Sequence, residues 1–191
     1  SSLGQLTEND IVRLAKNNLG ELFRTYMKSF DLETPYELYV GDKVNIKIGT
    51  TVDTTPEYLD YGSYYVHTKE YDRSTKTYTY TLCDKMLFTM VPFDWSKIVK
   101  NGSTVLTSTT LQDLVNYICE YCGIGTPDGT LVNGTNTVYK KTFDGYEITC
   151  RDVLDMCMQV SATSLIIVRT PGGIQDCSAS YKTISSTSPV K

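Results

Sequence analysis

The residues best suited to chemistry in this sequence are six cysteines and a single histidine. The sharpest motif is Cys119-Glu120-Tyr121-Cys122, which has the spacing of a redox pair. A redox pair depends on a lowered thiol pKa, which usually comes from the N-terminal end of a helix. This motif lies at the C-terminal end of a predicted helix, where the helix dipole disfavours a thiolate. We therefore interpret the motif as part of a packed core.

The other cysteines could complete a zinc site only by joining that motif, because a structural zinc ion takes four ligands. Cys150 and Cys157 are the candidates, but the six residues between them on a predicted helix do not give a zinc spacing. An even count of cysteines would suggest disulfides in a secreted protein, whereas thiols on apolar helix faces behave as small hydrophobes. We expect reduced cysteines in a protein made in a cytoplasm, with no metal ligand and no cofactor.

Catalytic groups other than thiols are sparse. The one histidine, His67, lies in a predicted strand beside tyrosines and has no partner at a recognisable catalytic spacing. No nucleophile-elbow or phosphate-loop motif is present. Paired carboxylates could hydrolyse a glycoside. The carboxylates of the β-rich region, however, lie in turn-rich stretches without distinguishing context: Asp53, Glu57, Asp60, Glu70 and Asp72. We predict that the protein is not an enzyme and has no catalytic residue.

The composition narrows the classes of partner. The chain of 191 residues carries a net charge of −4, with 15 tyrosines against 5 phenylalanines and 1 tryptophan. Proteins that bind nucleic acid usually present a basic face, so we expect no nucleic-acid partner. No apolar run approaches the roughly 18 residues of a membrane-spanning helix, so we expect no membrane partner. The chain begins Ser1-Ser2 without Met or a signal peptide, and we interpret it as a piece of a longer protein.

Hydrophobic periodicity divides the chain into four parts. The first two parts differ in the spacing of their apolar residues. Residues 1–30 predict an amphipathic helix, because apolar residues recur at three- and four-residue spacing from Ile11 to Tyr26. Residues 31–100 predict short antiparallel strands, because the period changes to two, as in Val44-Asn45-Ile46. Since no crossover helix separates these strands, they favour a small barrel-like or sandwich domain.

The third part, residues 101–170, predicts an α+β domain with two helices. Thr109 forms a capping-box pattern with Gln112 at the start of the first helix, which Gly123 ends. Thr149 caps the second helix. The expected apolar stripes are Leu111, Leu114, Val115, Ile118, Cys119 and Cys122 on the first helix, and Cys150, Val153, Leu154, Cys157 and Val160 on the second.

Strands and turns complete this part and the C-terminus. Asp144-Gly145 predicts a hairpin turn before a strand at Tyr146-Glu147-Ile148, and Leu165 to Val168 predicts a buried strand. Residues 171–191 are expected to form a C-terminal strand and tail. The predicted fold class is α+β, with a small antiparallel β-barrel-like part and a helix-containing α+β part.

The tyrosines leave two kinds of recognition open. Adjacent residues of a strand point to opposite faces, so at least one of Tyr64 and Tyr65 lies outside the core. An exposed tyrosine row suits a protein interface and suits equally a carbohydrate groove, for which Trp95 is the candidate platform. Ordinary cross-strand packing is the third interpretation of the same pattern.

Three stretches resemble, in order, the hub proteins of bacteriophage tail tips and baseplates, the group that includes the N-terminal region of tail-associated lysins. The first stretch runs from Tyr78 to Trp95, where a strand leads into Asp84-Lys85-Met86-Leu87-Phe88. The second runs from Thr110 to Gly123 and the third from Tyr146 to Val168. The region from the first stretch to the last, residues 78–168, spans about half of the chain.

The resemblance implies a structural role in a virion tail that is assembled in the bacterial cytoplasm. Such hubs pair barrel-like β domains with helices, assemble as trimers, and form a ring between the tail tube and spike. The implied partners are other tail or baseplate proteins and further copies of the chain. No catalytic residue carries over, because the cleaving activity of the lysin-type members lies in a separate C-terminal domain. The alternative function is a carbohydrate-binding module for host recognition.

Overall fold

The structure, a computed structural model, describes residues 23–169 and 177–182, and the chain divides into two compact units. Of the described residues, unit 1 holds 27–87, 167–169 and 177–178, and unit 2 holds 23–26, 88–166 and 179–182. The sequence-based division placed a boundary at residue 100. Most of the predicted N-terminal helix and of the predicted C-terminal tail lies outside the described residues.

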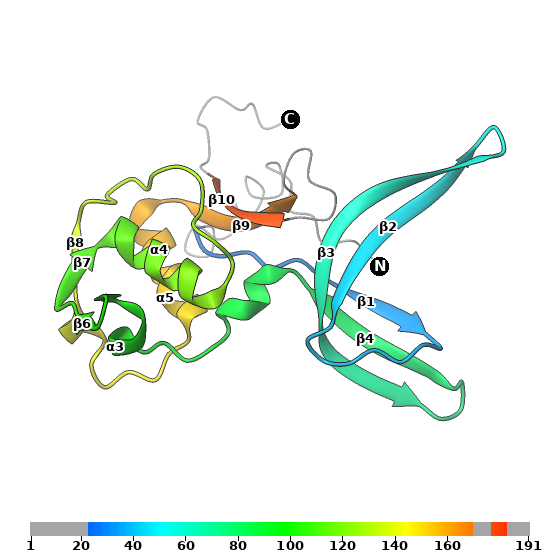
Figure 1. The fold of residues 1–191 in the computed structure, drawn as a ribbon, viewed down its shortest axis with the longest axis horizontal. Coiled ribbons are helices and arrows are strands. Elements are labelled where there is room, and N and C mark those ends of the chain that lie inside the picture. The colour runs from blue at the N-terminus through cyan, green and yellow to red at the C-terminus, as the bar shows by residue number, and fades with distance from the viewer. Residues whose placement is uncertain (1–22, 170–176, 183–191) are drawn as a thin grey trace. The chain divides into compact units, whose positions relative to one another are not determined.

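Unit 1 contains a four-stranded antiparallel sheet (Figure 1). Its strands stand in the order β1-β4-β3-β2. Their bounds are β1 (Ser29–Thr34), β2 (Lys43–Val52), β3 (Thr55–Asp72) and β4 (Thr77–Cys83). The sheet is open, with β1 and β2 at its edges, so the expected barrel-like part does not close into a barrel. The α+β class and the antiparallel strands are confirmed.

The long strand β3 pairs with two different strands along its length. Its C-terminal half, from Tyr65, pairs with β4, and its N-terminal half, up to the same residue, pairs with β2. Register shifts lie between Ile46 and Lys47 in β2 and between Val66 and Thr68 in β3. Beyond the ends of β1 and β4, β2 and β3 therefore continue as a two-stranded ribbon. We call residues 47–58 of this ribbon the arm.

One face of the sheet forms the core of unit 1. Tyr64, Val66, Tyr80 and Leu82 are buried at its centre. Side chains from β1, β2, β4 and the β1–β2 loop pack around them: Phe30, Leu32, Leu38, Val44, Ile46 and Tyr78. Tyr65 lies on the other face and is only half-buried, as the alternation of adjacent tyrosines predicted.

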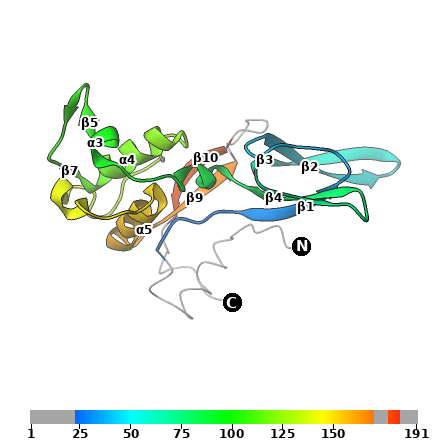
Figure 2. The ribbon, with the colours of Figure 1, turned by 90° about the horizontal axis from the view of Figure 1, so that it is seen from below.

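Unit 2 is built around two packed helices, α4 (Leu111–Cys122) and α5 (Cys150–Ser161) (Figure 2). Shorter elements precede and separate the two helices: α3 (Trp95–Ile98), β5 (Lys100–Asn101), β6 (Thr104–Val105), β7 (Ser108–Thr110), β8 (Thr137–Tyr139) and the 3-10 helix η2 (Lys140–Phe143). Two further strands pair with each other, β9 (Ser164–Arg169) and β10 (Cys177–Lys182), and a 3-10 helix η1 (Lys85–Thr89) follows β4. The predicted strand at Leu165–Val168 is thus confirmed.

The helix ends follow the predicted caps with one correction. Thr149 makes a full capping box with Asp152, and Gly123 ends α4 in the left-handed conformation at φ 78°. The cap of α4, however, is Thr110 and not Thr109, since the Thr110 hydroxyl accepts from the Asp113 amide at 3.1 Å. Thr109 is instead a residue of strand β7.

The apolar stripe of α5 also differs from the prediction at its last position. Val160 is exposed, whereas Met158 is fully buried. The buried positions of α5 step by three and four residues from Cys150 through Met158 to Ser161, and this helical period excludes residue 160.

The predicted hairpin at Asp144-Gly145 is wrong. These residues form a turn after η2, with Gly145 at φ 80°, but Tyr146 to Ile148 form no strand. The segment runs instead beside the stretch before α3, where the Phe93 amide donates to the Ile148 carbonyl at 2.9 Å. The strand before the turn, β8, pairs with β7.

Candidate interaction surface

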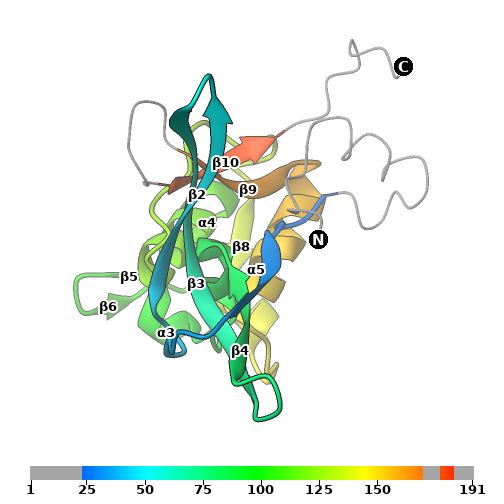
Figure 3. The same cartoon turned by 90° about the vertical axis from the view of Figure 1, so that its right-hand side faces the viewer.

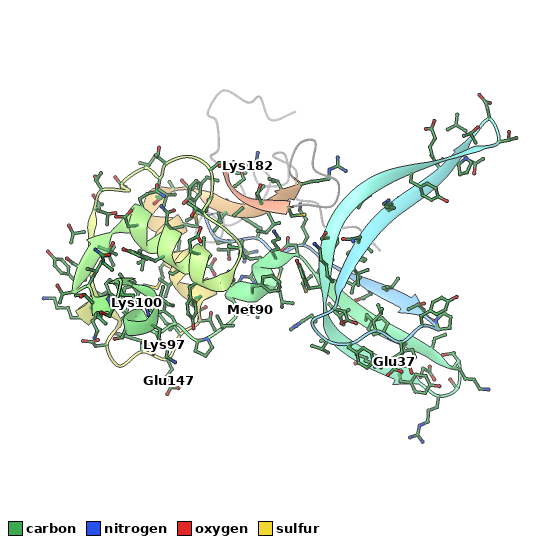
Figure 4. The ribbon with its side chains drawn as sticks, viewed as in Figure 1. Glu37, Met90, Lys97, Lys100, Glu147 and Lys182 are labelled. Carbon is green, nitrogen blue, oxygen red and sulfur yellow. The ribbon has the colours of Figure 1, made fainter. Side chains whose placement is uncertain are left out.

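A group of exposed aromatic rings surrounds one lysine on unit 1. The Lys69 ammonium lies 2.7 Å from the Glu37 carboxylate, which is labelled in Figure 4. The same nitrogen lies 4.7 Å from the ring centre of Tyr39 and 5.1 Å from that of Tyr78. The ring of Tyr71 packs on Tyr78 with centres 4.6 Å apart. We call Tyr39, Tyr71 and Tyr78, with Lys69 and Glu37, the tyrosine surface.

Two strands and one loop position these groups. Lys69 and Tyr71 pair with Tyr80 and Tyr78 across β3 and β4, so all four side chains point to the same face of the sheet. The loop between β1 and β2 brings Glu37 and Tyr39 to that face.

The contacts within the tyrosine surface set the protonation states of its groups. The hydrogen bond that the Lys69 ammonium donates to the Glu37 carboxylate raises the pKa of Lys69, so the lysine stays charged between the rings. Partial burial raises the pKa of the Tyr78 phenol, which stays neutral. Tyr39 remains 62% exposed. Exposed tyrosines held by a cation are typical of interfaces with other proteins.

The arm is the second notable surface of unit 1. Figure 3 shows β2 and β3 as a ribbon that runs past the ends of β1 and β4. Both faces of the arm are exposed, including Ile48 at 40%, Val52 at 47% and Tyr58 at 69%. The Tyr58 ring covers Gly49 of the opposite strand, where a Cβ atom would lie 2.9 Å from the ring. At the tip, Asp53 and Thr54 both have positive φ, as a tight hairpin turn of this twist requires.

The carboxylates considered for catalysis do not converge. Asp53 and Glu57 lie on the arm, while Glu70 and Asp72 lie at the opposite end of β3. Hydrogen bonds from Ser74 lower the pKa of Asp72, which marks a turn. Asp60 lies in β3, and its side chain is outside the described part of the structure.

The cysteines lie in packed positions, and all six are free thiols. Cys119 is fully buried between the helices, and burial raises its pKa. Burial also raises the pKa of Cys157 to about 12. A hydrogen bond with the Cys122 thiol, together with burial, raises the pKa of Cys150. The pKa of Cys119 is therefore raised, whereas a redox thiol has a lowered pKa. In the part of the chain that the structure describes, no cluster of three ligating side chains could hold a metal ion.

The structure also locates the two remaining candidates from the sequence, His67 and Trp95. His67 is an exposed residue at the register shift of β3. Trp95 is only 5% exposed, and its indole N–H donates to the Leu106 carbonyl at 2.7 Å. It packs near Phe143 and Phe93, with ring centres 5.8 and 6.5 Å away. Its ring is therefore not available as a stacking platform for a sugar.

A shallow depression of about 280 Å³ lies beside η2 in unit 2. Two of its lining residues form an ion pair, with the Lys140 ammonium 3.2 Å from the Asp144 carboxylate. The Lys141 ammonium lies 5.6 Å from the ring centre of Tyr139. Both lysines of the depression thus already have partners.

The tyrosine surface was not predicted from the sequence. Glu37 and Lys69 lie 32 residues apart in the chain, and only the path of the β1–β2 loop brings them together. The single signal that could have found them is the alternation along β3 and β4, which places Tyr71 and Tyr78 on the same face as Lys69.

Comparison with known proteins returned no relationship. No family model, no curated protein and no solved structure matches the chain. Among the described residues, no helix has both the length and the hydropathy needed to cross a bilayer.

Proposed function

We propose that the protein is a structural component of a phage or prophage tail tip or baseplate hub, which acts by assembly with other polypeptides. The observation that carries this proposal is the arm. A two-stranded hairpin alone is marginally stable in water, because neither of its faces is covered. The arm is a hairpin of this kind, and it exposes the side chains of Ile48, Val52 and Tyr58 to solvent. A protein partner that covers the arm would remove this apolar surface from water.

The tyrosine surface supports the same class of function. It presents large rings that are already held in place, which lowers the entropy lost when a partner binds. It lies beside an ion pair, Lys69 with Glu37, and contains no group with the geometry of a catalyst. Such a surface is suited to recognising protein.

The tail-tip assignment rests on the ordered resemblance of three stretches. The first stretch forms β4, η1 and the start of α3, the second forms α4 with its caps, and the third includes α5 and most of β9. The stretches therefore include most of β4, α4, α5 and β9 and the connections that lead into them.

The carbohydrate-binding alternative has less support. Its candidate platform, Trp95, is buried in unit 2. The faces of Tyr39 and Tyr78 are occupied by Lys69, which a sugar ring would have to displace. Protein assembly is therefore the function we favour.

The proposal is tested by co-expressing the chain with the products of the genes that flank it in its parent genome. We expect a stable complex with at least one flanking tail protein in size-exclusion chromatography. The double variant Tyr39→Ala with Tyr71→Ala should lose this complex. The matched control, Tyr146→Ala, removes an exposed tyrosine of unit 2 and should retain it. A chain that forms no complex with any flanking product contradicts the proposal.

A further inference from the structure

The four-stranded sheet of unit 1 has two open edges of opposite charge. In the described part of the chain, no further strand joins β1 at one edge or β2 at the other. β1 carries Asp31 and Glu33 and no basic residue. β2 carries Lys43 and Lys47 and no acidic residue.

These four charges lie on the same face of the sheet. Directly paired residues of antiparallel strands point to the same side. One row of such pairs crosses all four strands: Ser29, Cys83, Tyr65, Lys43. Asp31 and Glu33 share the side of the first residue of that row, because side chains alternate along a strand. Lys47 shares the side of Lys43, since the register shift beside it places the extra residue in β3. All four side chains are exposed.

The opposite face is apolar up to both edges. On β1, Phe30 and Leu32 pack half-buried against the core. On β2, Val44 and Ile46 do the same. Ile48 continues this stripe into the arm, where it is exposed. Each edge therefore presents an unpaired backbone, an apolar side and a charged side.

We infer that β1 of one copy of the chain pairs with β2 of a second copy, in antiparallel sense, and extends the sheet from copy to copy. The two edge strands run in opposite directions within the sheet, so its extension is antiparallel. This inference rests on the assembly role proposed above and names a second copy of the chain as the partner.

At least one register satisfies both faces of the sheet. With Asp31 opposite Lys47 of the second copy, all six residues of β1 lie opposite residues 44–49. Glu33 is then diagonal to Lys43. On the apolar face, this register produces two directly opposed pairs: Phe30 with Ile48, and Leu32 with Ile46.

Pairing of like edges lacks this complementarity. Two β1 edges would bring only carboxylates together on the charged face, and two β2 edges would bring only lysines. Like charges across an interface suppress the wrong contact, and opposite charges fix the register. Because the favoured contact joins two different edges, each added copy leaves one edge of each kind open, and a closed ring is the form that satisfies every edge.

The test uses the full chain with charge reversals at one or both edges. The β1 variant is Asp31→Lys with Glu33→Lys, and the β2 variant is Lys43→Glu with Lys47→Glu. In sedimentation velocity at about 50 mM salt, where surface charges are weakly screened, we expect wild type to self-associate. Each one-edge variant should raise the dissociation constant at least tenfold. The variant with all four reversals should return to within about threefold of wild type, because its edges are complementary again.

The control reverses exposed charges away from the edges, with Glu70→Lys on the inner strand β3 and Lys100→Glu in unit 2, the latter labelled in Figure 4. This variant should associate like wild type. Circular dichroism checks that each variant is folded. A zero-length carbodiimide, applied to an equal mixture of ¹⁵N-labelled and unlabelled chains, should join Asp31 to Lys47 in peptides of mixed label.

The inference is overturned if wild type is monomeric, if the one-edge variants associate like wild type, or if the four-fold reversal fails to recover association. The absence of a mixed-label link between the two edges also overturns it. Its failure is distinguishable from failure of the proposed function. If a complex with flanking tail proteins persists in any of these cases, the assembly role stands and only the pairing of edges is wrong.

Discussion

The hydroxyl of Tyr80 donates a hydrogen bond to the carbonyl oxygen of Tyr36 across 2.9 Å, although 44 residues separate the two in the chain. The Tyr80 hydroxyl oxygen also accepts a hydrogen bond from the Leu38 amide at 2.6 Å. Tyr80 is fully buried in the core of unit 1, so this one side chain ties the β1–β2 loop to the sheet. The loop carries Glu37 and Tyr39, so the tyrosine surface depends on this anchor.

Tyr80→Phe should therefore destabilise unit 1 and loosen the loop. It removes both hydrogen bonds between the Tyr80 hydroxyl and the backbone of the loop, which costs about 1–3 kcal/mol. The free energy of unfolding in urea measures the effect. Tyr71→Phe, which changes an exposed phenol, is the control and should shift it by less than about 0.5 kcal/mol. Equal effects of the two variants would contradict the anchor.

The capping box of α5 gives a second prediction. Thr149→Ala removes the hydroxyl that accepts from the Asp152 amide at 3.1 Å, and should cost about 1 kcal/mol of stability. Thr149→Ser keeps a hydroxyl at the cap and should restore most of the loss. Thermal unfolding of the three proteins checks this. A serine variant as unstable as the alanine variant would show that the methyl group, and not the cap, matters.

Burial of Tyr64 predicts a loss of stability at alkaline pH. Burial is the largest cause that raises the pKa of its phenol from 10.0 to about 12. The fold favours the neutral phenol, so this contribution is complete below pH 10 and is lost as the pH rises towards 12. The free energy of unfolding of wild type should fall more steeply over this range than that of Tyr64→Phe, by up to about 1.4 kcal/mol per pH unit. Parallel slopes would rule out the assigned burial of the phenol.

Thiol reactivity tests the packing of α4 against α5. Cys122 is half-buried, whereas Cys119 and Cys157 are buried and have raised pKa values. Iodoacetamide reacts with the thiolate, so Cys122 should be alkylated at least about tenfold faster than either. Peptide mass spectrometry over time measures the order, and the difference should vanish in denaturant. Faster labelling of Cys119 would contradict the packed-helix interpretation.

The helices were predictable from local signals, because each signal is contained within a few residues. The apolar stripe of α4 and its end at Gly123 follow from spacing and from the backbone freedom of glycine. The cap of α4 was misplaced by one residue because two adjacent threonines offer the same hydroxyl. Thr109 lies outside the helix because it pairs with Val138 of β8, and the sequence around it does not show this pairing.

The strands were predictable in type but not in arrangement. Alternation in β2 and β4 is visible in the sequence, yet nothing local shows that β3 divides its length between two partners. The tyrosine surface depends on that division and on the loop that Tyr80 anchors. Non-local contacts of this kind have no signature in residue spacing, so the candidate surface emerged only from the structure.

The central claim, that this chain is a structural part of a phage tail, is tested most directly on particles. Phage released from cells that carry the parent genome are labelled with an antibody to the chain and a gold conjugate, and viewed by electron microscopy. We expect gold at the tail end that is distal to the head, in intact particles or in tails opened by mild denaturant. Particles that remain unlabelled, while the chain is present in the cells that produced them, would contradict the claim.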